Sequence, residues 1–205
     1  MKQTVAPSIP ALSELDRPAL AALLSDIDVA SYRTDQIFDA AWRSTAASWS
    51  EVTTLGKPLQ AALESRLRYE AFSEIVREDA DEGETSKLLL TLHDGAKIES
   101  VLMRYPADRR RRIGPRATIC VSSQAGCAVG CPFCATGELG FTRNLTPGEI
   151  QDQVRIARRI LRGEGRELTN VVFMGMGEPL QNADAVFAAI DGITDPKRGG
   201  IGQRR

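Results

Sequence analysis

The feature that most constrains this chain is a cluster of three cysteines, Cys127, Cys131 and Cys134, spaced C-x3-C-x2-C within eight residues. This spacing brings three soft thiolate ligands close to one point, which suits an iron–sulfur cluster. Zinc in a structural site normally takes four protein ligands. The single histidine, His93, is far upstream, and the fourth cysteine, Cys120, precedes the cluster by seven residues. The triad therefore predicts a four-iron cluster with one iron left open for a ligand other than protein.

The composition is that of a globular chain with one large or two small domains. The 205 residues are 42% hydrophobic and 26% charged, with a formal net charge of −1. Nucleic-acid binding must then depend on local basic patches rather than on an overall positive field. No apolar run reaches the length of a membrane span, and four cysteines around one loop indicate metal ligands rather than a disulfide framework. We expect a cytoplasmic protein in a reducing compartment, with no membrane partner.

The N-terminal third has the periodicity of short helices. Residues 1–12 contain two prolines and predict a flexible leader. Apolar residues then recur at helical spacing, in a helix capped by Ser13, in a second helix from Arg33 to about Ser44, and in a third from Leu59 to Leu67. We expect residues 13–75 to form a small helical accessory domain.

The period changes after residue 71, where alternating apolar residues predict strands. A hairpin is expected between Lys87–Leu92 and Lys97–Arg104, with its turn at His93-Asp94-Gly95, because Asp-Gly tolerates the positive φ angles of tight turns. The acidic stretch Glu78–Glu84 is expected to be a solvated connection. Glu99 lies in the second strand of this hairpin, where most glutamates face solvent.

Residues 76–114 are then a β-hairpin extension followed by a basic linker. The linker carries the densest positive run, Arg109–Arg112. By itself this run is best explained as a solvated loop, and the functional alternative is contact with RNA phosphates.

From residue 115 onward the pattern is strand, helix, strand, helix. A buried strand over 117–121 leads directly into the cysteine loop, and Thr146-Pro-Gly-Glu149 begins a helix with a capping box. The outer face of this helix is expected to carry four arginines, Arg155, Arg158, Arg159 and Arg162.

The next strand is expected over 170–175, followed by a helix over 184–190 that buries Val186, Phe187 and Ile190. Such an order implies right-handed βαβ units on a parallel sheet, in which ligands sit at the carboxyl ends of the strands. The cysteine loop and Gly175–Pro179 should therefore face one another.

The cysteine spacing, with Phe133 before the third cysteine, resembles the radical S-adenosylmethionine superfamily. This resemblance implies that the three thiolates hold a [4Fe–4S] cluster. It also implies that the unique iron chelates S-adenosylmethionine, which is cleaved reductively to methionine and a 5′-deoxyadenosyl radical.

The flanking motifs resemble the RlmN/Cfr family of radical methyltransferases. They are Arg116–Cys127, Cys131–Gly137, Arg143–Thr146 with Glu149-Ile150, and Met174–Leu180. The family resemblance implies an α/β fold, in which a small N-terminal helical domain that helps to engage RNA precedes the first part of a partial (β/α)6 radical SAM barrel. It implies methylation of an adenine, expected at C2, of large-subunit (23S) ribosomal RNA, with tRNA as a second candidate substrate.

The same resemblance implies roles for individual residues. Gly177 and Glu178 would lie at the S-adenosylmethionine site together with Phe133 and Met174, and Glu178 would accept from the methionine amino group. Glu99 corresponds to a proton acceptor. Cys120 corresponds to the cysteine that resolves a covalent RNA–protein intermediate by forming a disulfide bond, and the alternative for Cys120 is a small buried side chain in a strand.

The family also uses a methyl-carrying cysteine near its C-terminus, and no cysteine follows Cys134 in this sequence. We therefore expect a truncated chain, with an incomplete radical SAM core over 115–205 that cannot finish the reaction cycle. The expected partners are 23S ribosomal RNA, tRNA and a flavodoxin-like electron donor, and we expect a monomer. Two alternatives stay open: another radical enzyme that acts on protein, and a non-catalytic iron–sulfur or zinc module that interacts with RNA.

Overall fold

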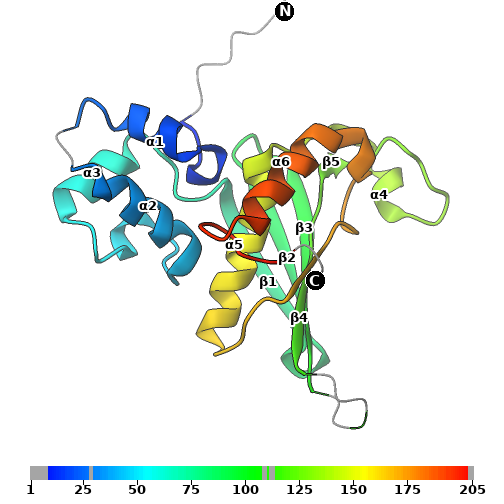
Figure 1. Ribbon diagram of the computed structural model, residues 1–205. Coiled ribbons are helices and arrows are strands. Elements are labelled where there is room, and N and C mark those ends of the chain that lie inside the picture. The colour runs from blue at the N-terminus through cyan, green and yellow to red at the C-terminus, as the bar shows by residue number, and fades with distance from the viewer. Residues whose placement is uncertain (1–8, 28–29, 108–109, 111–113, 203–205) are drawn as a thin grey trace, which may run out of the picture.

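The computed structural model describes residues 9–27, 30–107, 110 and 114–202. A group of short helices from the N-terminal third packs beside a sheet, and helices α5 and α6 accompany the sheet (Figure 1). Most of the predicted leader and three of the four arginines in the run Arg109–Arg112 lie outside the described residues. No helix in the described part of the chain is long and apolar enough to cross a membrane.

The helical unit encloses its own apolar core. Its elements are η1 (Leu12–Glu14), α1 (Arg17–Leu23), α2 (Tyr32–Arg43), η2 (Trp49–Glu51) and α3 (Lys57–Glu64). Ile37, Phe38 and Trp49 are almost completely buried in this core. The predicted cap at Ser13 is wrong, because Ser13 lies inside the 3-10 turn η1. Asp16 caps α1 instead, and its carboxylate accepts the Ala19 N–H at 2.8 Å.

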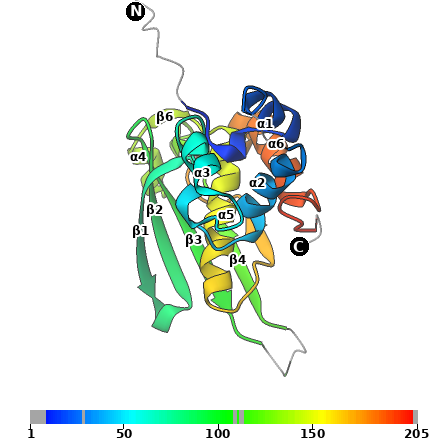
Figure 2. The same cartoon turned by 90° about the vertical axis from the view of Figure 1, so that its left-hand side faces the viewer.

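One mixed sheet forms the second unit. Its strands run in the order β1 (Phe72–Ala80), β2 (Thr85–Leu92), β3 (Lys97–Tyr105), β4 (Arg116–Cys120) and β7 (Asn170–Val172). Neighbours are antiparallel up to β4, and β4 and β7 are parallel. Figure 2 shows β1, β2 and β3 side by side, with α5 next to them.

The hairpin of β2 and β3 is confirmed, and Gly95 occupies its turn with φ +86°. The sequence predicts a solvated connection over 78–84. Glu78–Ala80 is exposed as expected but belongs to β1 and pairs with β2, so the connection is only η3 (Asp81–Gly83) and Glu84. Strand β1 begins at Phe72, inside the range 13–75 that the sequence suggested for the helical domain. Since β3 pairs with β4, the hairpin belongs to the same sheet as the strand before the cysteine loop.

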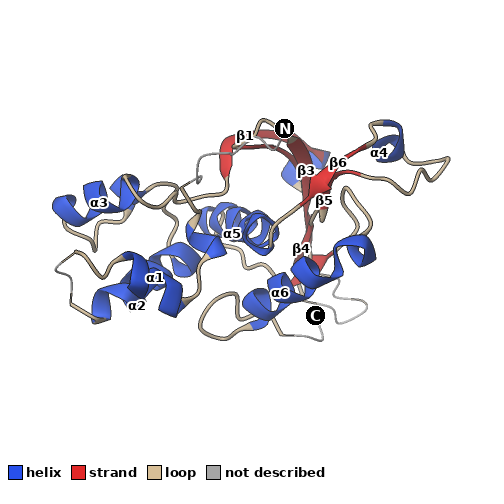
Figure 3. Cartoon of the chain, turned by 90° about the horizontal axis from the view of Figure 1, so that it is seen from above, coloured by secondary structure: helices blue, strands red, loops and turns tan. Residues whose placement is uncertain are grey.

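Helix α5 (Pro147–Gly163) lies between the helical unit and the sheet (Figure 3). It begins at the predicted capping box: the Thr146 side chain accepts the Glu149 N–H, and the Glu149 carboxylate accepts the Thr146 N–H. Ile150, Val154 and Ala157 are fully buried against the sheet. The helix therefore provides one wall of the core.

The expectation that the arginines of α5 face solvent is wrong. Arg155 is buried, donates to the carbonyl oxygens of Ala41 (3.0 Å) and Tyr69 (3.1 Å), and pairs with Asp152 one turn earlier. Arg159 pairs with Glu70 in the same interface. The helical unit covers this face of α5, and the arginines donate to backbone carbonyl groups of that unit.

Helix α6 (Ala183–Thr194) packs against α5. Val186, Ala189 and Ile193 are buried, at the i, i+3, i+7 spacing of one helix face. The prediction that Phe187 is buried is wrong: Phe187 lies one residue off this stripe and its side chain is 60% exposed.

Candidate active site

The cysteine loop begins directly after β4, at the carboxyl end of the parallel pair of strands. Its base is a two-stranded hairpin of β5 (Gln124–Gly126) and β6 (Phe141–Asn144). The Cys127 N–H closes this base by donating to the Gly140 carbonyl at 2.9 Å. Figure 1 shows this hairpin and the short helix α4 (Ala135–Glu138) projecting from one end of the sheet.

The three predicted cluster ligands, Cys127, Cys131 and Cys134, are half-buried free thiols on this loop. Hydrogen bonds from the backbone of Gly137 and Thr136, and from the Thr136 hydroxyl, lower the pKa of the Cys134 thiol. A lower pKa favours the thiolate, which is the form that binds iron. The donor set therefore fits an iron–sulfur cluster.

The structure does not gather these thiols around one point. Within the described ranges, no three histidine, cysteine or acidic side chains stand together as a group that could hold a metal ion. All four cysteines are free, so nothing here supports a disulfide at Cys120.

The second loop, Gly175–Pro179, follows β7 and lies against the segment that leads into the cysteine loop. The Met176 carbonyl accepts the N–H groups of Ser123 (2.9 Å) and Gln124 (3.2 Å). The Glu178 N–H donates to the Gln124 side-chain oxygen at 2.9 Å. The two loops are thus joined at their bases by backbone hydrogen bonds.

The residues predicted to bind S-adenosylmethionine differ in exposure: Gly177 and Glu178 are partly buried, whereas Phe133 and Met174 are exposed. Gly177 has φ +97°, and a Cβ at this position would lie 2.6 Å from the Gln124 Cβ, so only glycine allows this approach. The Glu178 carboxylate accepts the Leu180 N–H at 3.1 Å and is half-buried. Phe133 and Met174 are 90% and 80% exposed, and their side chains extend away from the protein core.

Glu99 and Cys120 lie on one face of the sheet, the face that is turned away from α5. Val101 stands opposite Cys120 in the register of β3 and β4, and Glu99 is the next residue along β3 on that face. The Glu99 carboxylate is 3.5 Å from the Lys87 ammonium and its side chain is 47% exposed. Burial raises the pKa of the Cys120 thiol, and a hydrogen bond from the Met174 backbone acts in the opposite direction.

A buried polar group beneath these residues has no counterpart in the sequence predictions. The Gln153 side chain of α5 bonds to Ser100 on β3 and to the backbone of Ser122 after β4. All three residues are at most 1% exposed. The available signal was a glutamine inside the apolar stripe of α5, between Ile150 and Val154.

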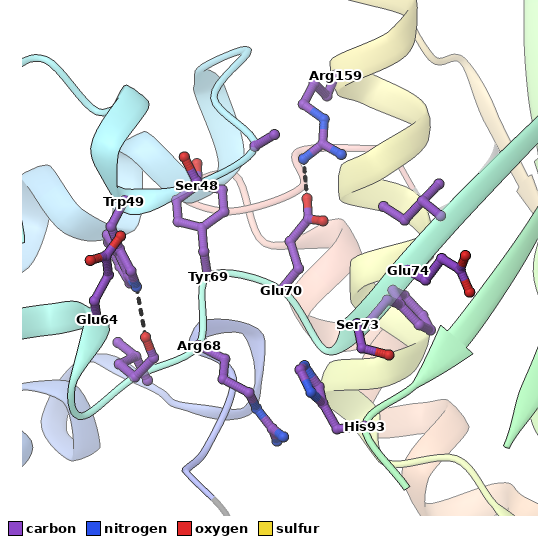
Figure 4. A pocket seen from close by; sticks show the side chains of 14 residues that line it. Ser48, Trp49, Glu64, Arg68, Tyr69, Glu70, Ser73, Glu74, His93 and Arg159 are labelled. Atoms are coloured by element: carbon purple, nitrogen blue, oxygen red, sulfur yellow. Dashed lines mark hydrogen bonds and ion pairs between the residues drawn. The ribbon is translucent and has the colours of Figure 1, made fainter. Parts of the chain in front are cut away.

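A cavity of about 440 Å³ lies elsewhere, between the helical unit and strand β1. Figure 4 shows the Glu70–Arg159 ion pair and the Trp49 indole, which donates to the Leu67 carbonyl at 2.6 Å. His93, predicted as a turn residue, lies beside Arg68, and burial together with this positive charge lowers the His93 pKa. None of the predicted site residues lines this cavity, so we do not assign the proposed chemistry to it.

No protein-family model matches the chain. It is 45% identical over 184 residues to a protein of Myxococcus xanthus named dual-specificity RNA methyltransferase RlmN 1, across 90% of this chain and 49% of that protein. It is 44% identical over 179 residues to a probable dual-specificity RNA methyltransferase RlmN of Corynebacterium diphtheriae, across 87% of this chain and 46% of that protein. The chain is a homologue of the RlmN family of RNA methyltransferases. It spans about half the length of these curated relatives.

The fold agrees with this relationship. A crystal structure of a radical SAM methyltransferase from Sphaerobacter thermophilus matches with a TM-score of 0.85 and 44% identity, over 95% of this chain and 55% of that chain. The predicted α/β fold with the first part of a radical SAM barrel is therefore confirmed.

Proposed function

We propose that this RlmN homologue supplies the cluster- and S-adenosylmethionine-binding part of an enzyme that methylates an adenine, at C2, in 23S ribosomal RNA. The observation that carries the proposal is the pairing of two loops. A loop with three free cysteines at C-x3-C-x2-C spacing is hydrogen-bonded at its base to the loop Gly175–Pro179.

In this proposal Cys127, Cys131 and Cys134 hold a [4Fe–4S] cluster. When bound, the cluster supplies the electron that cleaves S-adenosylmethionine reductively. Glu178 would accept a charge-assisted hydrogen bond from the ammonium group of the cofactor. The Glu178 backbone is already fixed by Gln124, so little ordering remains to be done on binding.

Glu99 would act as the proton acceptor. It lies on the open face of the sheet, next to the loop that carries Glu178, and its carboxylate is accessible to a substrate on that face. Cys120 would resolve a covalent RNA intermediate. Burial raises the pKa of Cys120, so its thiol is harder to deprotonate than that of an ordinary cysteine.

The proposed partners are 23S ribosomal RNA, tRNA as a second substrate, and a flavodoxin-like electron donor in the cytoplasm. The helical unit, docked through the arginines of α5, would offer a fixed surface for RNA. We also propose that the 205 residues alone do not methylate RNA, since the cysteine expected to carry the methyl group is not among their four cysteines.

The test is methylation of transcripts by the full gene product after anaerobic reconstitution with iron and sulfide. A 23S fragment, a tRNA and a control peptide are each offered with labelled S-adenosylmethionine, and the products are digested to nucleosides. We expect 2-methyladenosine from the 23S fragment and no label in the peptide. Label in the peptide alone would favour a radical enzyme acting on protein, and bound zinc without any methylation would favour a non-catalytic module.

A further inference from the structure

Ser122, the second residue after β4, lies between the two loops of the candidate site. Its side chain is fully buried and its hydroxyl makes two hydrogen bonds. The hydroxyl donates to the Glu99 carbonyl at 2.6 Å and accepts the Met176 N–H at 2.8 Å. One oxygen atom therefore connects the strand that carries Glu99 with the loop that carries Glu178.

The backbone of Ser122 is held just as firmly, by a side chain from helix α5. The Gln153 oxygen accepts the Ser122 N–H at 2.7 Å, and the Gln153 nitrogen donates to the Ser122 carbonyl at 3.0 Å. The same glutamine oxygen accepts the Ser100 hydroxyl at 2.7 Å. Every polar group of Ser122 is thus satisfied inside the protein, which is what a buried position requires.

The loop Gly175–Pro179 packs closely against Ser122 and β3. A Cβ on Gly175 would lie 2.7 Å from the Val121 carbonyl and 2.8 Å from the Ser122 hydroxyl, so the loop rests directly on this turn. The Glu99 N–H also contacts the Met176 sulfur at 3.3 Å. The loop and β3 therefore meet at Ser122 on one side and at Met176 on the other.

We propose that Ser122 and Gln153 are positioning residues that fix the loop Gly175–Glu178 relative to the strand of Glu99, and so set the geometry of the S-adenosylmethionine site. This inference rests on the proposed function for the identity of the ligand. Neither residue contacts the proposed ligand. Gln153 holds the backbone of Ser122, and Ser122 holds the backbone of Met176. Removing the hydroxyl leaves the half-buried Met176 N–H without its protein acceptor, and we expect the loop to move away from β3 until water can replace it.

The test compares Ser122→Ala with Ser86→Ala in the full gene product, reconstituted anaerobically. Ser86 is the matched control: it is also fully buried in the sheet, and its hydroxyl makes two bonds, to Asp79 (2.6 Å) and from Arg104 (2.8 Å). It lies near the start of β2 and pairs with Leu102, whereas Glu99 pairs with Leu89. Both variants lose a buried hydroxyl, but only the Ser122 hydroxyl is hydrogen-bonded to the loop Gly175–Pro179.

Two quantities are measured: the S-adenosylmethionine dissociation constant, and the amide exchange rate of Met176 in the cofactor-free protein. Ser122→Ala should weaken binding about tenfold, or about 1.4 kcal/mol, while the iron content per chain stays at the wild-type value. The Met176 amide should exchange at least about tenfold faster, as expected when one hydrogen bond is lost. Ser86→Ala should change neither quantity.

Wild-type affinity in Ser122→Ala, or equal weakening in both variants, would overturn the positioning role. If Ser122→Ala does not fold, Ser122→Cys replaces it, because the thiol keeps a side chain at this position but is only a weak hydrogen-bond donor and acceptor, and shifts in the same direction are expected. A wild-type protein that binds no S-adenosylmethionine would overturn the proposed function. The Met176 exchange rate would then still decide whether Ser122 fixes the loop.

Discussion

At the scale of single residues, the two loops of the site depend on a glycine that has no room for a Cβ and on buried polar side chains with specific hydrogen-bond partners. Gly177 is the sharpest case, because it combines a positive φ angle with close contact to Gln124. Ser122 and Gln153 are buried polar groups whose partners are all found within the protein. These residues shape the loops, whereas the cysteines and glutamates carry the proposed chemistry.

Gly177→Ala should disturb the loop more than a glycine substitution with the same backbone strain elsewhere. The control is Gly95→Ala, since Gly95 has φ +86° but a Cβ there would have no atom within 4 Å. Strain alone costs roughly 1–2 kcal/mol, and Gly177→Ala adds a clash with Gln124. We expect urea denaturation to show the larger loss of stability for Gly177→Ala, together with loss of S-adenosylmethionine binding. Equal effects in both variants would contradict the close packing.

The thiols should differ in reactivity before any cluster is bound. The pKa of Cys134 is lowered by hydrogen bonds and that of Cys120 is raised by burial, so as the pH rises the thiolate forms first at Cys134. The cofactor-free protein is treated with iodoacetamide over about three pH units, up to the ordinary pKa of cysteine, and Cys134 should be labelled before Cys120. Peptide mass spectrometry gives the site, and faster labelling of Cys120 would contradict these environments.

At the scale of elements, helix α5 is the part on which the others depend. One face closes the core of the sheet, and the opposite face holds the helical unit through the buried Arg155 and the half-buried Arg159. The helix also carries Gln153, whose side chain holds the backbone of Ser122 beside the two loops of the site.

Arg155→Met should destabilise the protein by about 3–5 kcal/mol, because it leaves the buried Asp152 carboxylate without its cation. Arg43→Met is the control: Arg43 pairs with Asp39 on the surface, where both side chains are more than half exposed, and such pairs contribute about 0–1 kcal/mol. Chemical denaturation measures both changes. Similar small losses would show that the arginine face of α5 is not a structural interface.

The elements also show what sequence patterns can and cannot predict. The hairpin turn at Asp94-Gly95 and the capping box at Thr146 are determined by local chemistry, and both were found where expected. The arginines of α5 were misplaced because periodicity separates polar from apolar faces but does not say which polar face meets another unit. Ser122 could not be singled out for the same reason: its role depends on contacts with residues far away in the chain.

At the scale of the whole molecule, the chain spans about half the length of its RlmN relatives, and 95% of it superposes on a radical SAM methyltransferase with a TM-score of 0.85. The cysteine loop and the loop Gly175–Pro179 extend from one end of the sheet, and the face with Glu99 and Cys120 is open beside them. The thiols are present on one loop but are not gathered. In the proposed function, cluster binding would bring these three thiols closer together.

The most direct test of the central claim is reductive cleavage of S-adenosylmethionine by the full gene product. The protein is reconstituted anaerobically with iron and sulfide and reduced with dithionite, and 5′-deoxyadenosine is quantified by chromatography, with Cys131→Ala as the matched variant. We predict 5′-deoxyadenosine from the wild-type protein and none from Cys131→Ala, which loses one of the three ligands. Wild-type protein that binds iron and sulfide but forms no 5′-deoxyadenosine, or equal formation by Cys131→Ala, would contradict the assignment of the cysteine loop.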